Sequence, residues 1–171
     1  PKPVAGVYPL GESPTDCRLA AEIREITGAL LGVLHLRKPI ILSEALRAQG
    51  MTESRYCKIR ELGAAGLAAH HVMATLRSSR AALLEHLHGT ARAIERFELS
   101  PDFKSVPTGD QIQKLMDLQG AAPPEQPLAE FLPAWLTDPA VYAEAVEEEL
   151  QRYQQIAELS EQLSDGREQA K

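Results

Sequence analysis

Aromatic residues and cysteines are scarce in this chain of 171 residues. Aromatic side chains make up 5% of it, and Cys17 and Cys57 are its two cysteines. β-Branched residues are also few beside alanine and leucine, and this composition favours helices over sheets. Neither the number nor the spacing of the cysteines suggests a disulfide framework or a metal knuckle. We therefore expect two buried or half-buried thiols in an intracellular protein, either cytoplasmic or nuclear.

Long apolar runs are absent as well. No stretch of the sequence approaches the roughly 18 apolar residues that indicate a membrane-spanning helix, so we expect no membrane partner. The first residues, Pro1 to Val4, lack the charged and then apolar layout of a signal peptide.

Sequence signatures of catalysis are missing too. The chain contains no G-x-x-x-x-G-K-[ST] phosphate loop, no G-x-S-x-G elbow and no H-E-x-x-H zinc motif. No general base can be identified beside either cysteine from the sequence. We expect a protein that is not an enzyme, with no catalytic residue and no cofactor.

The histidines form no metal motif. His70 and His71 are adjacent, and His86 and His88 lie two residues apart, so the members of each pair diverge on a helix. Glu85 and His88 form one Glu-x-x-His pair, whereas ferritin-like di-iron sites use two such pairs and two further glutamates. We expect ordinary histidines on helix surfaces and no bound metal.

What the chain does have is a division of charge by position. Residues 1–104 carry 14 Lys and Arg against 11 Asp and Glu, a net charge of +3, and residues 105–171 carry 4 against 13, a net charge of −9. This division favours two surfaces with different partners. The glutamates at 147–149 belong to the acidic part, and we expect them on a solvated helix face.

Helix signals define the basic part. Ser13 is a predicted N-cap, because Pro14 and Asp16 follow it in the favoured positions, and an apolar stripe continues the helix to about residue 36. Further patterns predict a short helix over 43–49, a helix over 53–62 that Thr52 caps and Gly63 ends, and a long helix over about 67–99.

Prolines interrupt the helical patterns of the acidic part. Thr108 and Gln111 predict a capping box for a short helix that ends at Leu118. A second short helix is expected over 128–136. Asp138 should cap the last helix, with a proline at its first position.

These patterns predict an all-α fold, an antiparallel helical bundle with a long central helix. Residues 1–12 are expected to form a mobile arm, and residues 13–104 the core of the bundle. Residues 105–171 form an acidic helical segment that packs on the core or binds a partner.

Residues 42–66 have a helix-turn-helix layout, with a turn at Gly50 between two helical patterns. The stretch R-E-L-G-A-A-G-L, residues 60–67, resembles the end of a winged-helix recognition helix. That resemblance implies contacts from Arg55, Lys58 and Arg60 to nucleic acid. The layout departs from a winged helix because a helical stripe, not a β-wing, follows it. The alternative is a structural corner of the bundle.

A second candidate surface surrounds the single tryptophan. Leu128, Phe131 or Leu132, and Trp135 follow the i, i+3/i+4, i+7 spacing with which an amphipathic helix enters a groove of its partner. Tryptophan is also enriched at binding hot spots. The alternative is that these four residues cover the protein's own bundle.

The leading hypothesis is therefore a non-enzymatic interaction protein, an adaptor or assembly subunit that works through helix–helix contacts. A protein partner is expected, and a homo-oligomer is left open. The alternative hypothesis is a helix-turn-helix regulator that binds nucleic acid.

Overall fold

The computed structural model describes residues 13–100 and 108–164 of the chain. Over these two ranges the chain forms α-helices and short 3₁₀ turns without any strand, which confirms the predicted all-α class. The predicted mobile arm, residues 1–12, lies outside the described residues.

The first helix, α1 (Pro14–Gly28), begins as predicted but ends early. Ser13 and Asp16 form a capping box, in which each side chain accepts a hydrogen bond from the other residue's backbone N–H, at 3.0 and 3.1 Å. The helix ends at Gly28, and the chain is turned away from the helix direction at Gly32, whose φ of 76° lies in the left-handed region that favours glycine. A 3₁₀ turn, η1 (Val33–His35), follows.

The longest helix, α3 (Glu53–Ser78), follows the five-residue α2 (Glu44–Ala48). Thr52 caps α3 as predicted, but the predicted end at Gly63 is wrong, since the helix continues for 15 more residues. A glycine inside a helix costs only about 1 kcal/mol relative to alanine, and burial of the following turns outweighs it. The buried side chains beyond it are Ala64, Ala68, Val72 and Leu76.

The predicted long helix over 67–99 is wrong. In its place α3 ends, and α4 (Arg80–His88) and α5 (Thr90–Phe97) follow as separate helices. The Ser79 side chain caps α4, and Gly89, with a φ of 87°, separates α4 from α5. Periodicity missed the first break because the buried Leu76 and Leu83 continue the apolar stripe across it.

The acidic part supplies α6 (Gln111–Met116) and α7 (Pro139–Glu161), and Asp138 caps α7 as predicted. The predicted capping role of Thr108 is wrong: Asp110 occupies the N-cap of α6, without a side-chain cap. Thr108 instead donates a hydrogen bond of 3.1 Å from its hydroxyl to the carboxylate of Glu85.

The predicted helix over 128–136 is also wrong. Two separate 3₁₀ turns, η3 (Ala129–Phe131) and η4 (Ala134–Leu136), occupy these residues. Pro133 lies between them and explains the interruption, because proline has no N–H and its ring clashes with the preceding helical turn.

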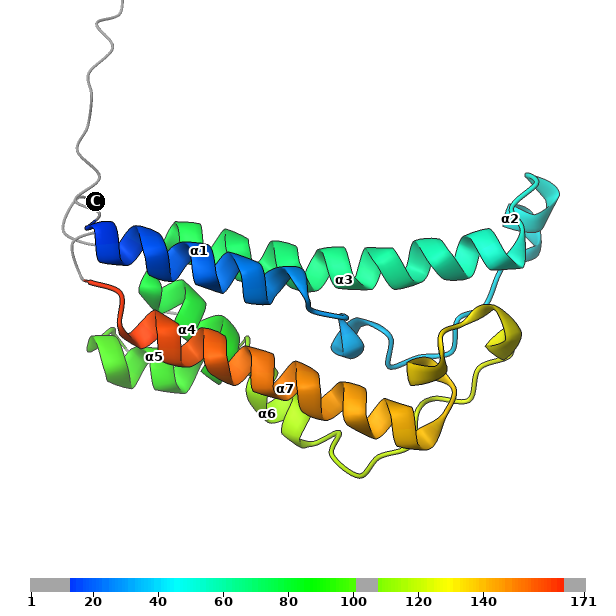
Figure 1. Ribbon diagram of the computed structural model, residues 1–171. Helices are drawn as coiled ribbons and strands as arrows, with labels where there is room; N and C mark the ends of the chain where they lie inside the picture. The colour runs from blue at the N-terminus through cyan, green and yellow to red at the C-terminus, as the bar shows by residue number, and fades with distance from the viewer. Residues whose placement is uncertain (1–12, 101–107, 165–171) are drawn as a thin grey trace, which may run out of the picture.

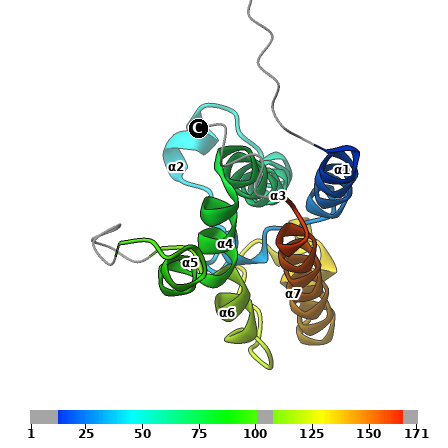
Figure 2. The same cartoon turned by 90° about the vertical axis from the view of Figure 1, so that its left-hand side faces the viewer.

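The helices form an elongated antiparallel bundle (Figure 1). The helix α3 runs along most of its length, with α1 beside it in the opposite direction. The helix α7 runs beneath α1, also in the opposite direction to it, and α4, α5 and α6 complete the lower part. Viewed along the bundle, α1 and α7 lie together on one side of the molecule (Figure 2).

Two hydrophobic clusters hold these elements together. The larger one joins α1, α3, α4, α6 and α7. Its fully buried members include Ile23, Val72, Leu83, Leu87, Leu115 and Ile156. The smaller one packs the chain around η1 and η4 against the first half of α3. It consists of Leu36, Ile40, Leu42, Cys57, Ala64, Leu128 and Leu136.

A buried carboxylate ties α7 to the turn after α1. The predicted solvated face at 147–149 is wrong for Glu149, whose exposed fraction is 1%, while Glu147 and Glu148 are exposed. The Glu149 carboxylate accepts hydrogen bonds from three successive backbone N–H groups, those of Leu31 (2.6 Å), Gly32 (3.1 Å) and Val33 (2.9 Å).

A second buried carboxylate joins the two ends of the described chain. Besides capping α1, Asp16 accepts hydrogen bonds from the backbone N–H (2.8 Å) and the hydroxyl (2.6 Å) of Ser164. These bonds, followed by those from Ser13, hold the pKa of Asp16 well below its usual range. The start of α1 and the chain just beyond α7 are thereby held together.

Candidate interaction surfaces

The three basic residues predicted for nucleic acid all lie on the first turns of α3, and all are exposed. Arg55 and Lys58 share a side of the helix because they are three residues apart. Arg60 follows Lys58 by two residues and therefore points elsewhere. The ammonium of Lys58 also pairs with the carboxylate of Glu61 at 2.8 Å. The structure thus does not bring the three charges together on one face.

The four residues predicted as partner anchors are divided between the core and the surface. Leu128 is buried in the smaller hydrophobic cluster, and Leu132 packs against it. Trp135 packs against both clusters from η4. Phe131 alone of the four is exposed, with an exposed fraction of 37%. Three of the predicted anchors are therefore used within the fold.

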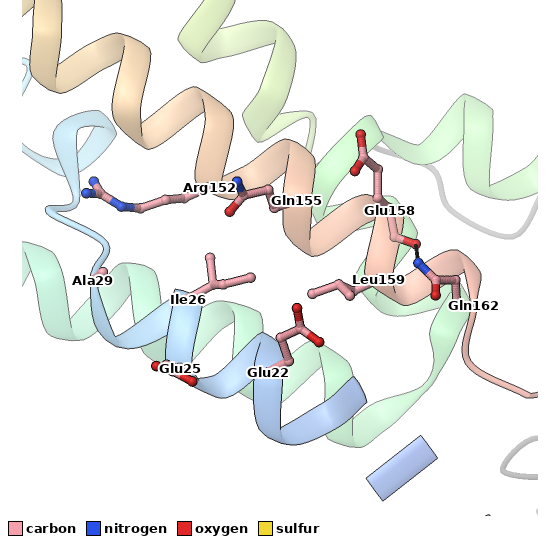
Figure 3. A pocket seen from close by; sticks show the side chains of 9 residues that line it. All are labelled: Glu22, Glu25, Ile26, Ala29, Arg152, Gln155, Glu158, Leu159 and Gln162. Carbon is pink, nitrogen blue, oxygen red and sulfur yellow. Dashed lines mark hydrogen bonds between the residues drawn. The ribbon is translucent and has the colours of Figure 1, made fainter. Parts of the chain in front are cut away.

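A groove between α1 and α7 was not predicted from the sequence. It has a volume of about 580 Å³ and takes its walls from two helices that are far apart in the chain. Ile26 of α1 and Leu159 of α7 point toward each other across its floor (Figure 3). Its lining residues are Glu22, Glu25, Ile26, Ala29, Arg152, Gln155, Glu158, Leu159 and Gln162.

The groove is acidic at its edges. Glu22 reaches in beside Leu159, while Glu25 and Glu158 lie along the outer edges of the two helices (Figure 3). The single cation of the lining, Arg152, is paired with the Glu148 carboxylate at 2.9 Å. Three carboxylates therefore surround an apolar floor.

An apolar face of α3 is the second surface that sequence analysis missed. Ile59, Leu62 and Leu67 are exposed, with exposed fractions of 47%, 59% and 49%. Ile59 and Leu62 point away from Ala64 and Ala68, which face the core, whereas Leu67 follows Ala64 by three residues and lies on the same side of the helix as Ala64. The predicted end at Gly63 hid this face, because it assigned these residues to two different helices.

A chain of histidine rings crosses the middle of the bundle. The ring centroid of His71 lies 5.7 Å from that of His35, 6.0 Å from that of His70 and 6.0 Å from that of His86. The His86 ring is also 6.3 Å from that of Tyr153 on α7. The sequence did not reveal this chain, because His35 of η1 and His86 of α4 reach His71 only through the packing of those elements.

His86 is half-buried, with its Nε2 atom enclosed by the fold. Burial lowers its pKa to about 4, and the positive charges that His71, Lys114 and His35 carry when protonated act in the same direction. The neutral imidazole is thus the form present at neutral pH. Among residues 13–100 and 108–164, no group of three or more His, Cys, Asp and Glu side chains has an arrangement that could hold a metal ion.

Comparison with known proteins adds no relative: no protein-family model, no curated protein and no solved structure matches the chain. Within the described residues, none of the helices combines the length and the apolar character needed to cross a membrane.

Proposed function

We propose that this chain is a non-enzymatic interaction protein, an adaptor or assembly subunit, that binds a helix of a partner protein in the groove between α1 and α7. The observation that carries the proposal is the composition of the groove, an apolar floor of Ile26 and Leu159 between carboxylates. Such a surface complements an amphipathic helix whose apolar stripe is flanked by lysine or arginine.

The spacing of the lining residues favours a helix as the bound element. On α1 and its C-cap they recur from Glu22 to Ala29, and on α7 and its C-cap from Arg152 to Gln162, at steps of three and four. The groove therefore follows two helix axes for about two to three turns, roughly 10–15 Å. A third helix laid along it would bury its apolar stripe and keep its charged sides near Glu22, Glu25 and Glu158.

A synthetic helix provides a direct test. The probe is a fluorescent peptide of about 18 residues, long enough to be helical, with leucine at i, i+3, i+4 and i+7 and lysine elsewhere. Fluorescence anisotropy should detect its binding to the full chain, and added salt should weaken that binding. A peptide with the same leucines and glutamate in place of lysine should bind at least about tenfold more weakly.

Charge reversal tests whether the peptide binds in the groove. Replacing Glu22 and Glu25 together, as Glu22→Lys and Glu25→Lys, should abolish the preference for the lysine peptide. The matched control reverses two exposed glutamates elsewhere, Glu95→Lys and Glu130→Lys, and should retain it. Equal binding of both peptides, or equal loss in both double variants, would reject the groove as the binding site.

The proposal includes an intracellular location, which the absence of a disulfide framework favours. The helix-turn-helix alternative has weaker support, since Arg60 does not share a face with Arg55 and Lys58.

A further inference from the structure

A second concave surface, here called the α3 hollow, lies where α3 passes η1. It has a volume of about 250 Å³ and is mostly apolar. In Figure 1 the first half of α3 extends beyond the end of α1, so this half is not covered by α1. The lining of the hollow consists of His35, Leu36, Ile59, Arg60, Gly63, Ala64 and Leu67, none of which lines the groove between α1 and α7.

Small residues on α3 create the hollow. Ile59, Gly63 and Leu67 follow one another at steps of four and therefore lie in one row along the helix. Gly63 has no side chain, and a Cβ added to it would meet no atom within 4 Å, so a gap is left between the two larger residues. The buried residues Leu36 and Ala64 form the base of this gap.

The size of the hollow suits a side chain better than a whole small molecule. Sites for drug-sized ligands usually have volumes of about 300–1,000 Å³, and the α3 hollow, at about 250 Å³, lies below that range. Its two larger walls, Ile59 and Leu67, are apolar and have exposed fractions of 47% and 49%. An aliphatic or aromatic side chain placed between them would remove apolar surface from water on both sides.

The charge around the hollow is positive. Arg60 belongs to the lining, and Arg55 lies one turn before Ile59 on the same side of the helix. Both arginines are exposed, and neither forms an ion pair with any residue of the described ranges. His35 adds no charge at neutral pH, because burial, followed by the nearby His71, lowers its pKa.

Carboxylates are missing from both walls of the hollow. The sequence has no Asp or Glu over residues 26–43, which include η1, or over residues 62–84, which include the rest of α3. Glu61 is close in sequence but is not part of the lining, and its carboxylate pairs with Lys58 at 2.8 Å. An incoming carboxylate would therefore meet the guanidinium of Arg60 without a carboxylate of either wall to repel it.

We propose that the α3 hollow binds an acidic peptide segment of a partner protein, with one apolar side chain seated between Ile59 and Leu67 and a neighbouring carboxylate bonded to Arg60. Arginine suits this role because its planar guanidinium can donate two parallel hydrogen bonds to one carboxylate. Nucleic acid fits less well, since apolar walls offer a phosphate backbone no partner and Lys58 is already paired.

The contact is small, so we expect weak and reversible binding with a dissociation constant of about 100 μM. The hollow shares no lining residue with the groove. The inference is therefore independent of the proposed function, and either one can fail without the other.

Titration of the full chain with a synthetic peptide tests the hollow. The probe is a short peptide with a central phenylalanine flanked by aspartates and with serine elsewhere. Nuclear magnetic resonance of the isotope-labelled protein should show the amide signals of Gly63 and Ala64 shifting as the peptide is added. A peptide with lysine in place of aspartate, and one with serine in place of phenylalanine, should each bind at least about tenfold more weakly.

Two variants locate the binding. Gly63→Leu fills the hollow with a better helix former than glycine, so it should weaken peptide binding at least about tenfold without loss of thermal stability. Gly28→Leu is its matched control, because Gly28 is also an exposed helical glycine with open space at its Cβ. Arg60→Gln should weaken binding at least about threefold, whereas Arg92→Gln, at an exposed arginine of α5, should leave it unchanged.

Several outcomes would overturn the proposal. Equal binding of the aspartate and lysine peptides would remove the role of charge, and undiminished binding to Gly63→Leu would place the peptide elsewhere. A DNA duplex that shifts the Gly63 signal when the peptide does not would assign the surface to nucleic acid. Self-association in sedimentation that Gly63→Leu abolishes, without any peptide binding, would assign the hollow to a second copy of the chain.

Discussion

Glu149 is a charged side chain that the fold has fully enclosed. Burial raises the pKa of its carboxyl group, and the hydrogen bonds from Leu31, Val33 and Gly32 act against that rise. Its value to the protein is structural, because the three N–H groups it binds have no partner in a continuing helix.

Replacing this carboxylate should be costly. Glu149→Ala leaves the three buried N–H groups without their acceptor, and we expect the free energy of unfolding to fall by about 3 kcal/mol. Urea denaturation followed by circular dichroism measures the loss. The control is Glu148→Ala, which removes an exposed ion pair and should cost less than about 1 kcal/mol. Similar values for the two variants would contradict the role assigned to Glu149.

His86 makes stability depend on pH. Its pKa in the folded chain is about 4, against an ordinary value of 6.5, so the unfolded chain binds a proton first as the pH falls. Stability should be complete above pH 6.5 and should decrease between pH 6.5 and about 4, by roughly 3 kcal/mol for this residue.

Substitution isolates that contribution. His86→Leu replaces the imidazole by an apolar side chain that does not titrate. The free energies of unfolding at pH 7 and pH 4.5 should therefore differ less than in the wild type. His70→Gln changes an exposed histidine and serves as the control. A wild-type pH dependence in the His86→Leu variant would assign the effect to other groups.

At the scale of elements, local signals were the most reliable part of the sequence. The caps at Ser13, Thr52 and Asp138 were predicted correctly, because a capping side chain bonds to a backbone N–H only two or three residues away. Helix ends without such a signal were missed. The turn at Gly32 is an example, since the position of Glu149, which binds its N–H, follows only from the complete fold.

Gly32 marks the closest approach between this turn and α3. A Cβ at this position would lie 2.3 Å from the carbonyl carbon and oxygen of Ala64, and the φ of 76° is unfavourable for any other residue. Gly32→Ala should therefore lower the free energy of unfolding by about 3 kcal/mol or more. Gly66→Ala, where a Cβ has open space inside α3, should instead raise it by up to about 1 kcal/mol. Thermal or urea unfolding of both variants checks the opposite signs.

At the scale of the whole molecule, the acidic helix α7 is part of the core. Tyr142, Val146, Leu150, Tyr153 and Ile156 are buried in the larger cluster. Truncation after Asp138 removes all of them, and we expect the remaining chain to lose cooperative unfolding. Near-ultraviolet circular dichroism and a urea titration measure this. A truncated chain that still unfolds in one sharp transition would show that the N-terminal helices fold without α7.

Composition and periodicity predicted the fold class, since both depend on residues close together in the chain. The groove and the histidine chain could not be predicted in this way. Ile26 and Leu159 face each other from opposite ends of the sequence, and His35 reaches His71 only because η1 packs on α3. Such pairings depend on how helices pack, about which a single sequence carries little information.

Asp16 accepts hydrogen bonds from Ser164, so the start of α1 is tied to the end of α7 only after residue 164 has been synthesised. The α1 wall of the groove leaves the ribosome first, and at ordinary translation rates the α7 wall follows roughly 7 to 27 s later. During that interval the apolar side of α1 lacks its cover, and the groove proposed to bind a partner helix has only one of its two walls. If the groove binds a partner as proposed, the nascent chain becomes competent only when α7 emerges, and a product interrupted before α7 would not compete for that partner.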